Sequence, residues 1–278
     1  AVMMEVAEEG AEVLVGDPMY ATYEGVIRAT GAAMVPVPLR PENGFRMAAA
    51  DVAARITPRT RVILLTTPHN PTGAILTRED IAALGRLAVE HDLWIISDEV
   101  YEDLVFEGSE FVSPLSDPDL AERVVAVSSI SKSHAAPGFR SGWCVGSLEF
   151  TANLLALSET MLFGNQPFIA DMTEQAVREG SDVAAGMRQR FAARAELLAA
   201  RLERETALRV HIAATGLDGE SYAFDLLEKT GVAVMPGASF GKTLDTWVRL
   251  ALTVEDAPFA QAIDRIVAHA NARRVKIA

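Results

Sequence analysis

Short, uniformly apolar segments alternate with helix-like segments through the first 150 residues. The clearest apolar segments are Arg61 to Thr67, Leu93 to Ile96 and Val124 to Val127. Between the first two, Thr77 begins a predicted helix, and Asp80 stands in its acidic first turn. Strands that are apolar on both sides and separated by helices are typical of a parallel sheet covered on both faces. The pattern therefore predicts an α/β fold.

Further segments extend this pattern toward both ends of the 278-residue chain, which is long enough for one large domain or two smaller ones. Glu12 to Val15 and Ala33 to Leu39 are predicted strands, and two prolines favour an edge position for the second. Leu148 to Leu202 is predicted to be mostly helical, and shorter elements follow. We therefore expect a large domain over residues 1–203, with a mostly parallel sheet sandwiched by helices, and a smaller α+β domain over residues 204–278.

Composition excludes several classes of partner. Lys and Arg total 25 against 38 Asp and Glu, so the formal charge of −13 argues against nucleic acid and anionic membranes. No run approaches the roughly 18 uncharged apolar residues of a membrane span, and Ala1 to Glu9 lacks the basic head of a secretory signal. The histidine spacing predicts no metal site. A single cysteine, Cys144, fits a reducing compartment, so we expect a cytoplasmic protein.

Polar side chains follow the three clearest strands at the points where the strands end. In an open parallel sheet these carboxyl ends share one edge, where ligands bind. Each residue alone has an ordinary structural explanation: Asn70 could form a turn, Asp98 could cap a helix and Lys132 could be a solvated loop residue. Their shared position favours a common site. The residues concerned are Asn70, Asp98, Tyr101, Ser129, Ser131 and Lys132.

Three linked motifs carry a resemblance to a known family. They are HNPTG at His69–Gly73, SDEVY at Ser97–Tyr101 and SISKSHAAPGFRSGW at Ser129–Trp143. In order and spacing they resemble the class I/II aminotransferases, which are pyridoxal-phosphate enzymes of the fold-type I group. The similarity extends from about Gly10 to the C-terminus. It implies a fold-type I architecture and transfer of an amino group from an amino acid to a 2-oxo acid such as pyruvate or 2-oxoglutarate.

The resemblance also implies roles for the residues around the cofactor ring. Lys132 corresponds to the lysine that forms an imine with pyridoxal phosphate and then moves a proton, and an amine suits both tasks. Asp98 corresponds to the carboxylate that keeps the pyridine nitrogen protonated. Tyr101 and Asn70 correspond to residues that hydrogen-bond the ring oxygen, and Tyr20 stands where the family stacks an aromatic on the ring.

Charged ends of cofactor and substrate are matched by a second set of residues. Ser129, Ser131 and Arg140 correspond to ligands of the cofactor phosphate, because hydroxyls and a guanidinium are strong phosphate donors. Arg249 corresponds to the arginine that binds the substrate α-carboxylate, and its forked geometry suits that group better than lysine. Arg249 could instead be a strand arginine in a surface ion pair. The family is typically a homodimer with its active site at the subunit interface, so we expect one here.

Two departures from the family affect what this chain can do alone. The family has a segment before the point where this chain begins, which supplies a phosphate loop and a contact from the neighbouring subunit. A Gly-rich strand of the small domain also has no clear counterpart between Val210 and Thr215. We therefore expect the printed chain to lack pieces of the working protein.

Substrate preference has two sequence indications. The family often binds a second substrate carboxylate with an arginine that would fall near Phe163 to Pro167, and no arginine occurs between Phe150 and Val177. We therefore expect neutral or basic amino acids to be better donors than dicarboxylic ones. The segments Asp17–Glu24 and Pro36–Arg46 look like the arginine–pyruvate transaminase branch of the family.

Competing functions remain open at the level of sequence. A β-lyase shares the same cofactor and motifs, and a non-catalytic cofactor-binding regulator shares the fold. A nucleotide hydrolase is disfavoured because Gly237–Thr243 has three residues between its glycines, whereas a phosphate-cradling loop needs four. A dehydrogenase is disfavoured because the chain contains no G-x-G-x-x-G.

Overall fold

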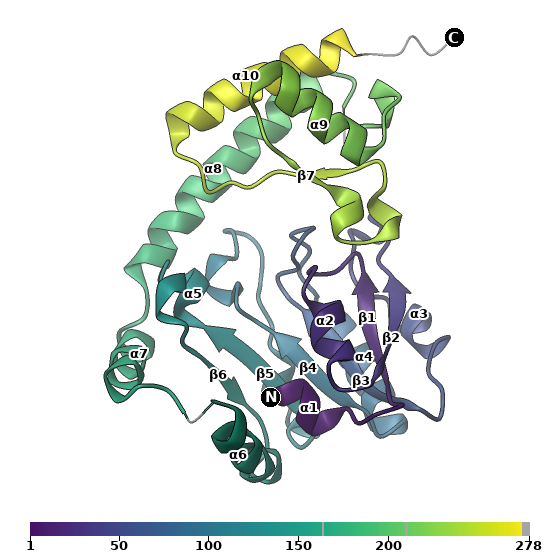
Figure 1. Ribbon diagram of the computed structural model, residues 1–278, viewed down its shortest axis with the longest axis vertical. Helices are drawn as coiled ribbons and strands as arrows, with labels where there is room; N and C mark the ends of the chain where they lie inside the picture. Colours follow the sequence, from purple (N-terminus) through teal and green to yellow (C-terminus); the bar gives the residue numbers. More distant parts are fainter. Residues whose placement is uncertain (163, 209–210, 274–278) are drawn as a thin grey trace. The chain divides into compact units, whose positions relative to one another are not determined.

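Six strands form one sheet in the order β2-β1-β3-β4-β5-β6 in this computed structural model, which describes residues 1–162, 164–208 and 211–273 (Figure 1). Strands β1 to β5 are parallel, and β6 pairs antiparallel with β5 at one edge. The mostly parallel sheet confirms the predicted α/β class. The strands are β1 (Glu12–Asp17), β2 (Ala33–Pro38), β3 (Thr60–Thr66), β4 (Trp94–Asp98), β5 (Val124–Ser129) and β6 (Gly142–Val145).

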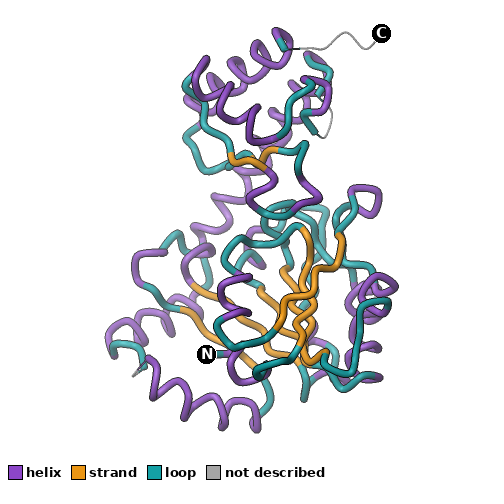
Figure 2. The backbone as a smooth tube through the Cα atoms, turned by 45° about the vertical axis from the view of Figure 1, so that its right-hand side comes forward, coloured by secondary structure: helices purple, strands orange, loops and turns teal. Residues whose placement is uncertain are grey.

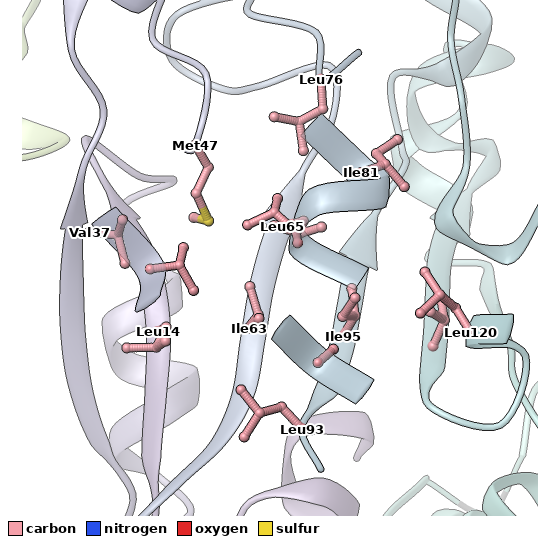
Figure 3. Packing of buried hydrophobic residues seen from close by; sticks show 14 of the residues in the cluster. Leu14, Val37, Met47, Ile63, Leu65, Leu76, Ile81, Leu93, Ile95 and Leu120 are labelled. Atoms are coloured by element: carbon pink, nitrogen blue, oxygen red, sulfur yellow. The ribbon is translucent and has the colours of Figure 1, made fainter. Parts of the chain in front are cut away.

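The two faces of this sheet are set by alternating apolar side chains. In β3, Ile63 and Leu65 join one buried cluster while Val62 and Leu64 join another, because successive residues of a strand point to opposite faces. The first cluster is covered by α3 (Ala49–Ala53) and α4 (Arg78–Glu90), and part of it is drawn in Figure 3. The second is covered by α1 (Val2–Val6), α2 (Tyr23–Arg28) and α6 (Leu148–Leu162). Figure 2 shows the resulting layers of helix, strand and helix.

Helix α4 begins where the sequence predicts. The hydroxyl of Thr77 accepts a hydrogen bond from the backbone N–H of Asp80, and the Asp80 carboxylate accepts one from the backbone N–H of Thr77. This reciprocal capping satisfies two N–H groups that the helix itself leaves without partners. Ile81, Leu84 and Ala88 then face the sheet.

The contacts divide the described chain into two compact units, Ala1–Gly186 and Met187–Ala278. The division lies inside α8 (Asp182–Glu205), whereas the predicted boundary near residue 203 lies close to the end of the same helix. The change in residue pattern near residue 203 marks the end of α8. The division at Gly186 instead reflects where the packing partners of this helix change. The first unit also contains α5 (Ile130–Ser133) and α7 (Pro167–Glu179).

The second unit packs two further helices and the part of α8 from Met187 onward around its own apolar core. Tyr222 and Leu226 of α9 (Gly219–Thr230) lie in one buried cluster with Ile266 of α10 (Asp256–Ala272). A short antiparallel pair, β7 (Met235–Pro236) and β8 (Val248–Arg249), completes it. Two 3-10 turns, Gly237–Ser239 and Lys242–Leu244, lie between β7 and β8. Of the stretch from Val210 to Thr215, where the family strand has no clear counterpart, Val210 lies outside the described residues and Ala213–Thr215 form a 3-10 turn.

Across the described ranges, no helix combines the length and the apolarity that a membrane crossing requires.

Candidate active site

The carboxyl ends of β3, β4 and β5 lie side by side in the centre of the sheet (Figure 1). Thr66 at the end of β3 pairs in register with Asp98 at the end of β4, and Asp98 pairs in register with Val127 of β5. Ser129 ends β5, and the short helix α5 that carries Lys132 starts at the next residue. The parallel register therefore gathers the polar residues that the sequence placed at one edge.

Asp98 is held by Tyr23, a residue outside the three motifs. The hydroxyl of Tyr23 donates to Asp98 Oδ2 over 2.5 Å, and the same hydroxyl lies 2.8 Å from Thr66 Oγ1. A phenol has one proton, and it goes to the carboxylate, so the Thr66 hydroxyl donates to the Tyr23 oxygen. The backbone N–H of Val100 donates to Asp98 Oδ1 over 3.3 Å. Tyr23 is itself buried on the first turn of α2.

The charge on Asp98 is costly where it lies. Burial raises the pKa of Asp98, while the Tyr23 hydrogen bond, the Val100 N–H and the positive charge of Lys132 act in the opposite direction. Burial and the neighbouring Asp98 charge raise the pKa of Tyr23, which keeps the phenol protonated and able to donate. A cationic partner for Asp98 would offset the cost of burying its carboxylate.

The side chains of Lys132 and Tyr101 lie close together beyond the ends of β5 and β4. The amine Nζ of Lys132 lies 5.7 Å from the centre of the Tyr101 ring. Tyr101 follows the end of β4, and its side chain is half-buried, whereas the Lys132 side chain is exposed. The structure thus brings Asp98, Tyr101 and Lys132 together, as the motifs predicted.

Asn70 is carried by a loop that His69 stabilises. Burial lowers the pKa of His69 to about 4, so its ring is neutral, and its Nδ1 lies 2.7 Å from Thr72 Oγ1. The backbone carbonyl of Pro18 accepts a hydrogen bond from the same ring. His69 therefore joins the Asn70 loop to the segment that leads to Tyr20, so that two predicted cofactor contacts share one support.

The remaining predicted ligands of the first unit differ in how firmly they are held. Ser129 caps α5, since its hydroxyl accepts from the backbone N–H of Ser131 over 3.3 Å. Arg140 is exposed, has a left-handed backbone at φ 52°, and donates to the Pro137 carbonyl over 2.9 Å. That bond uses one of the five N–H donors of a guanidinium. Tyr20 is 39% exposed and meets Tyr23 edge to face at 5.5 Å.

Arg249 belongs to the second unit, on β8. Its guanidinium lies over the ring of Phe240, 4.5 Å from the ring centre. A cation–π contact of this kind restricts a long side chain without using its hydrogen-bond donors. The stretch from Phe163 to Pro167, near which the family's arginine for a second carboxylate would fall, begins outside the described residues, and Gly164 to Gln166 lie between α6 and α7.

Sequence offers only an indirect signal for Tyr23, a second tyrosine three residues after Tyr20. Tyr20 lies before α2, in a turn where the backbone N–H of Tyr23 donates to the carbonyl of Tyr20. The pairing with Asp98 depends on α2 covering the face of the sheet to which Asp98 points, and that required the register of β1, β3 and β4.

The donor set of the first unit fits pyridoxal phosphate better than a metal. Burial raises the pKa of Asp98, and a protonated ring nitrogen is a cation that would favour its ionised carboxylate. The hydroxyls and the guanidinium of Arg140 suit a phosphate. The exposed amine of Lys132 is accessible to an aldehyde. Within residues 1–162, 164–208 and 211–273, no group of three or more His, Cys, Asp or Glu side chains is arranged to hold a metal ion.

Known proteins with similar sequences are aminotransferases. The family model for aminotransferase class I and II matches residues 1–266. Arginine–pyruvate transaminase AruH of Pseudomonas aeruginosa is 43% identical over 277 residues, which cover 96% of this chain and 70% of that protein. A probable N-succinyldiaminopimelate aminotransferase of Mycobacterium tuberculosis is 33% identical and covers 96% of this chain and 73% of its own length.

Solved structures agree with this assignment. N-succinyldiaminopimelate aminotransferase from Mycobacterium tuberculosis superposes with a TM-score of 0.89 at 31% identity, over 97% of this chain and 74% of that one. An aromatic aminotransferase from Pyrococcus horikoshii gives a TM-score of 0.92 at 26% identity, over 98% of this chain and 76% of that one. With a family match over nearly its whole length, the chain belongs to the class I and II aminotransferases.

Proposed function

We propose that this aminotransferase uses pyridoxal phosphate to move the amino group of a neutral or basic amino acid to a 2-oxo acid such as pyruvate or 2-oxoglutarate. The observation that carries the proposal is the cluster of Asp98, Tyr101 and Lys132 at the ends of adjacent strands. Members of class I and II use this cofactor, and the donor set described above fits it.

In this proposal the first unit binds the cofactor through three groups of residues. Asp98 pairs with the protonated ring nitrogen, supported by Tyr23. Asn70 and Tyr101 donate to the ring oxygen, and Tyr20 covers a ring face. The phosphate is bound by Ser129, Ser131 and Arg140. Once bound, pyridoxal phosphate supplies an electron sink for the bond broken at the substrate α-carbon.

Proton movement is assigned to Lys132. Its amine Nζ would take the proton from the substrate α-carbon and carry it to its next acceptor, which a flexible four-carbon stem permits. Asp98 stays ionised while it faces a cation, because an opposite charge favours the charged form of a carboxylate. Tyr101 lies against the Lys132 amine and limits where it can move.

Arg249 is proposed to bind the α-carboxylate of the substrate. A guanidinium presents two parallel N–H donors to a carboxylate, and stacking on Phe240 restricts the orientation of the Arg249 fork.

The donor preference rests on two supports. The segment from Phe150 to Val177 contains no arginine to pair with a second substrate carboxylate. AruH, at 43% identity, is named for the use of arginine with pyruvate. Aspartate aminotransferases are also among the similar proteins, at 31% identity for that of Streptomyces avermitilis, so aspartate is the informative competitor.

A homodimer is proposed from an exposed apolar surface. Leu148 and Leu155 of α6 are 91% and 59% exposed, and Phe168 of α7 is 65% exposed. Large apolar side chains this exposed on two successive helices would be covered in an interface. We propose that a second copy covers them. A dimer mass in light scattering, reduced to a monomer by L155E with F168E, supports this; a monomeric wild type contradicts it.

A cytoplasmic location is proposed from cysteine usage. The chain has one cysteine, Cys144, and burial raises the pKa of its thiol, which disfavours the reactive thiolate. One cysteine cannot form a disulfide within the chain, so an oxidising compartment would not stabilise this chain through an internal disulfide. Cell fractionation of the full protein tests the location, and recovery outside the cytoplasm contradicts it.

The experiment that tests the proposed activity follows both products. Purified protein with pyridoxal phosphate is given arginine, phenylalanine or aspartate together with pyruvate or 2-oxoglutarate, and alanine together with 2-oxoglutarate. We expect stoichiometric formation of a new amino acid and a new 2-oxo acid, with aspartate slowest, and loss of the reaction in K132A. Ammonia released without an acceptor would indicate a β-lyase, and no turnover with bound cofactor would indicate a regulator.

A further inference from the structure

His134 is a motif residue that the proposed chemistry does not use. It follows Lys132 by two positions, just after α5 ends. Its Nε2 lies 3.2 Å from the carbonyl of Ala176 and 3.2 Å from the carbonyl of Gly180, at the end of α7. Its Nδ1 lies 2.8 Å from the hydroxyl of Ser133.

These contacts determine which ring nitrogen carries the proton. Carbonyl oxygens only accept, so Nε2 must carry a hydrogen and donate to the carbonyls of Ala176 and Gly180. In the neutral ring Nδ1 is then an acceptor, and the Ser133 hydroxyl donates to it at 2.8 Å in preference to the Ser129 carbonyl at 3.4 Å. One tautomer satisfies every contact of the ring, which indicates a fixed orientation.

A second bond joins the same two segments in the opposite direction. The hydroxyl of Ser181, which follows α7, donates to the backbone carbonyl of Ser133 over 2.6 Å. The last carbonyls of a helix have no partner inside the helix, so the His134 ring also completes the end of α7. The turn that carries Lys132 is thereby tied to α7 at adjacent residues, and α5 and α7 pack together (Figure 1).

We propose that His134 is a positioning residue that holds the Lys132 amine in place for proton transfer. Helix α5 has four residues, too few to be stable alone, so its orientation depends on external bonds. Misplacement of a reacting group by about 1 Å can cost about 100-fold in rate. The inference rests on the proposed function, since it needs Lys132 to be the reacting amine.

The test measures how fast Lys132 is labelled by pyridoxal phosphate, as well as turnover. Cofactor-free protein is mixed with a limiting amount of pyridoxal phosphate, reduced with borohydride at set times and digested, and labelled Lys132 is quantified by mass spectrometry. The variants are H134N, H134Q and S181A, with H91N as a matched control on an exposed histidine after α4. Glutamine can place an amide N–H near the position of Nε2, whereas asparagine cannot.

We expect H134N to slow labelling of Lys132 by about 10-fold and to lower kcat by about 10- to 100-fold while KM for the amino donor changes less than about 3-fold. H134Q should recover most of both losses, and H91N should behave as the wild type. A purely structural role predicts a lower Tm without this split or recovery.

Labelling and kcat of H134N equal to those of the wild type would overturn the inference. If H134N does not fold, S181A removes the other bond between the segments, and an unchanged labelling rate there counts equally against it. A wild type that is labelled elsewhere than at Lys132 would refute the proposed function itself, and the inference with it.

Discussion

Removing the Tyr23 hydroxyl should expose the cost of burying Asp98. In Y23F the ring keeps its place in the core of the first unit, and the change removes one oxygen that donates to Asp98 and accepts from Thr66. Phenylalanine leaves almost no cavity, so the effect reports on the hydrogen bonds. Asp98 then has a 3.3 Å bond from the N–H of Val100 and the charge of Lys132 to offset its burial.

The magnitude follows from the charge of the acceptor. A hydrogen bond to a charged group contributes about 1.5–3 kcal/mol, and one between neutral groups about 0.5–1.5 kcal/mol. We expect Y23F to lower the free energy of unfolding of the first unit by about 1.5–3 kcal/mol at pH 7, the amount for a charged acceptor. In a D98N background the same change should cost the smaller amount, which leaves a coupling of about 1 kcal/mol between the two positions.

The pH dependence has a definite sign. Burial raises the pKa of Asp98, so the folded protein retains this proton after the unfolded chain has lost it, and stability falls as pH rises through that interval. Tyr23 donates to the ionised form and limits the fall. The difference between wild type and Y23F should therefore be smallest below the ordinary aspartate pKa of about 3.9 and largest above the raised pKa of Asp98.

Urea unfolding followed by tryptophan fluorescence measures these energies. The W247F background removes the tryptophan of the second unit, so that Trp94 and Trp143 report on the first. This separation matters because a chain with two units need not unfold in one step. A loss below about 0.5 kcal/mol in Y23F at pH 7, or equal losses with and without D98N, would refute the reasoning.

Three further changes test other parts of the account. G142A should lower the stability of the first unit by about 1–3 kcal/mol, because a Cβ there would lie 2.7 Å from the carbonyl oxygen of Ser128; an unchanged urea midpoint contradicts the packing. T77A should cost about 1 kcal/mol by removing the cap that Thr77 forms with Asp80, and T77S should restore it. R249K should raise KM for the amino donor with little change in kcat, since lysine cannot form a bidentate pair; an unchanged KM argues against the assigned role of Arg249.

Much of the first unit could be predicted because its strands are buried on both faces. The stretch Arg61–Thr67 has an uninterrupted apolar centre at Val62–Leu65, Val124–Val127 is apolar throughout, and both lie within a residue or two of β3 and β5. The edge position of β2 followed from its prolines. Strand β6 was not predicted, because Gly142–Val145 is short, half-exposed and paired only with β5. It is a strand because its backbone pairs with β5.

The site was predictable to the extent that motifs follow strand ends. Asp98 and Lys132 could be placed at one edge from sequence, because parallel strands share a direction. The contacts of Tyr23 and His134 could not be predicted from sequence, because each depends on how a helix packs against a distant part of the chain. Tyr23 needs α2 over the strand ends, and His134 needs the end of α7, 42 residues further along.

The most direct measurement is the visible absorption spectrum of the purified protein with pyridoxal phosphate. The account predicts a band from a covalent link between Lys132 and the cofactor, which disappears in K132A while the variant stays folded by circular dichroism. Borohydride reduction of the wild type should abolish the band and fix the added mass on Lys132. An identical band in K132A, or no band in a wild type that catalyses transamination, would contradict the central claim.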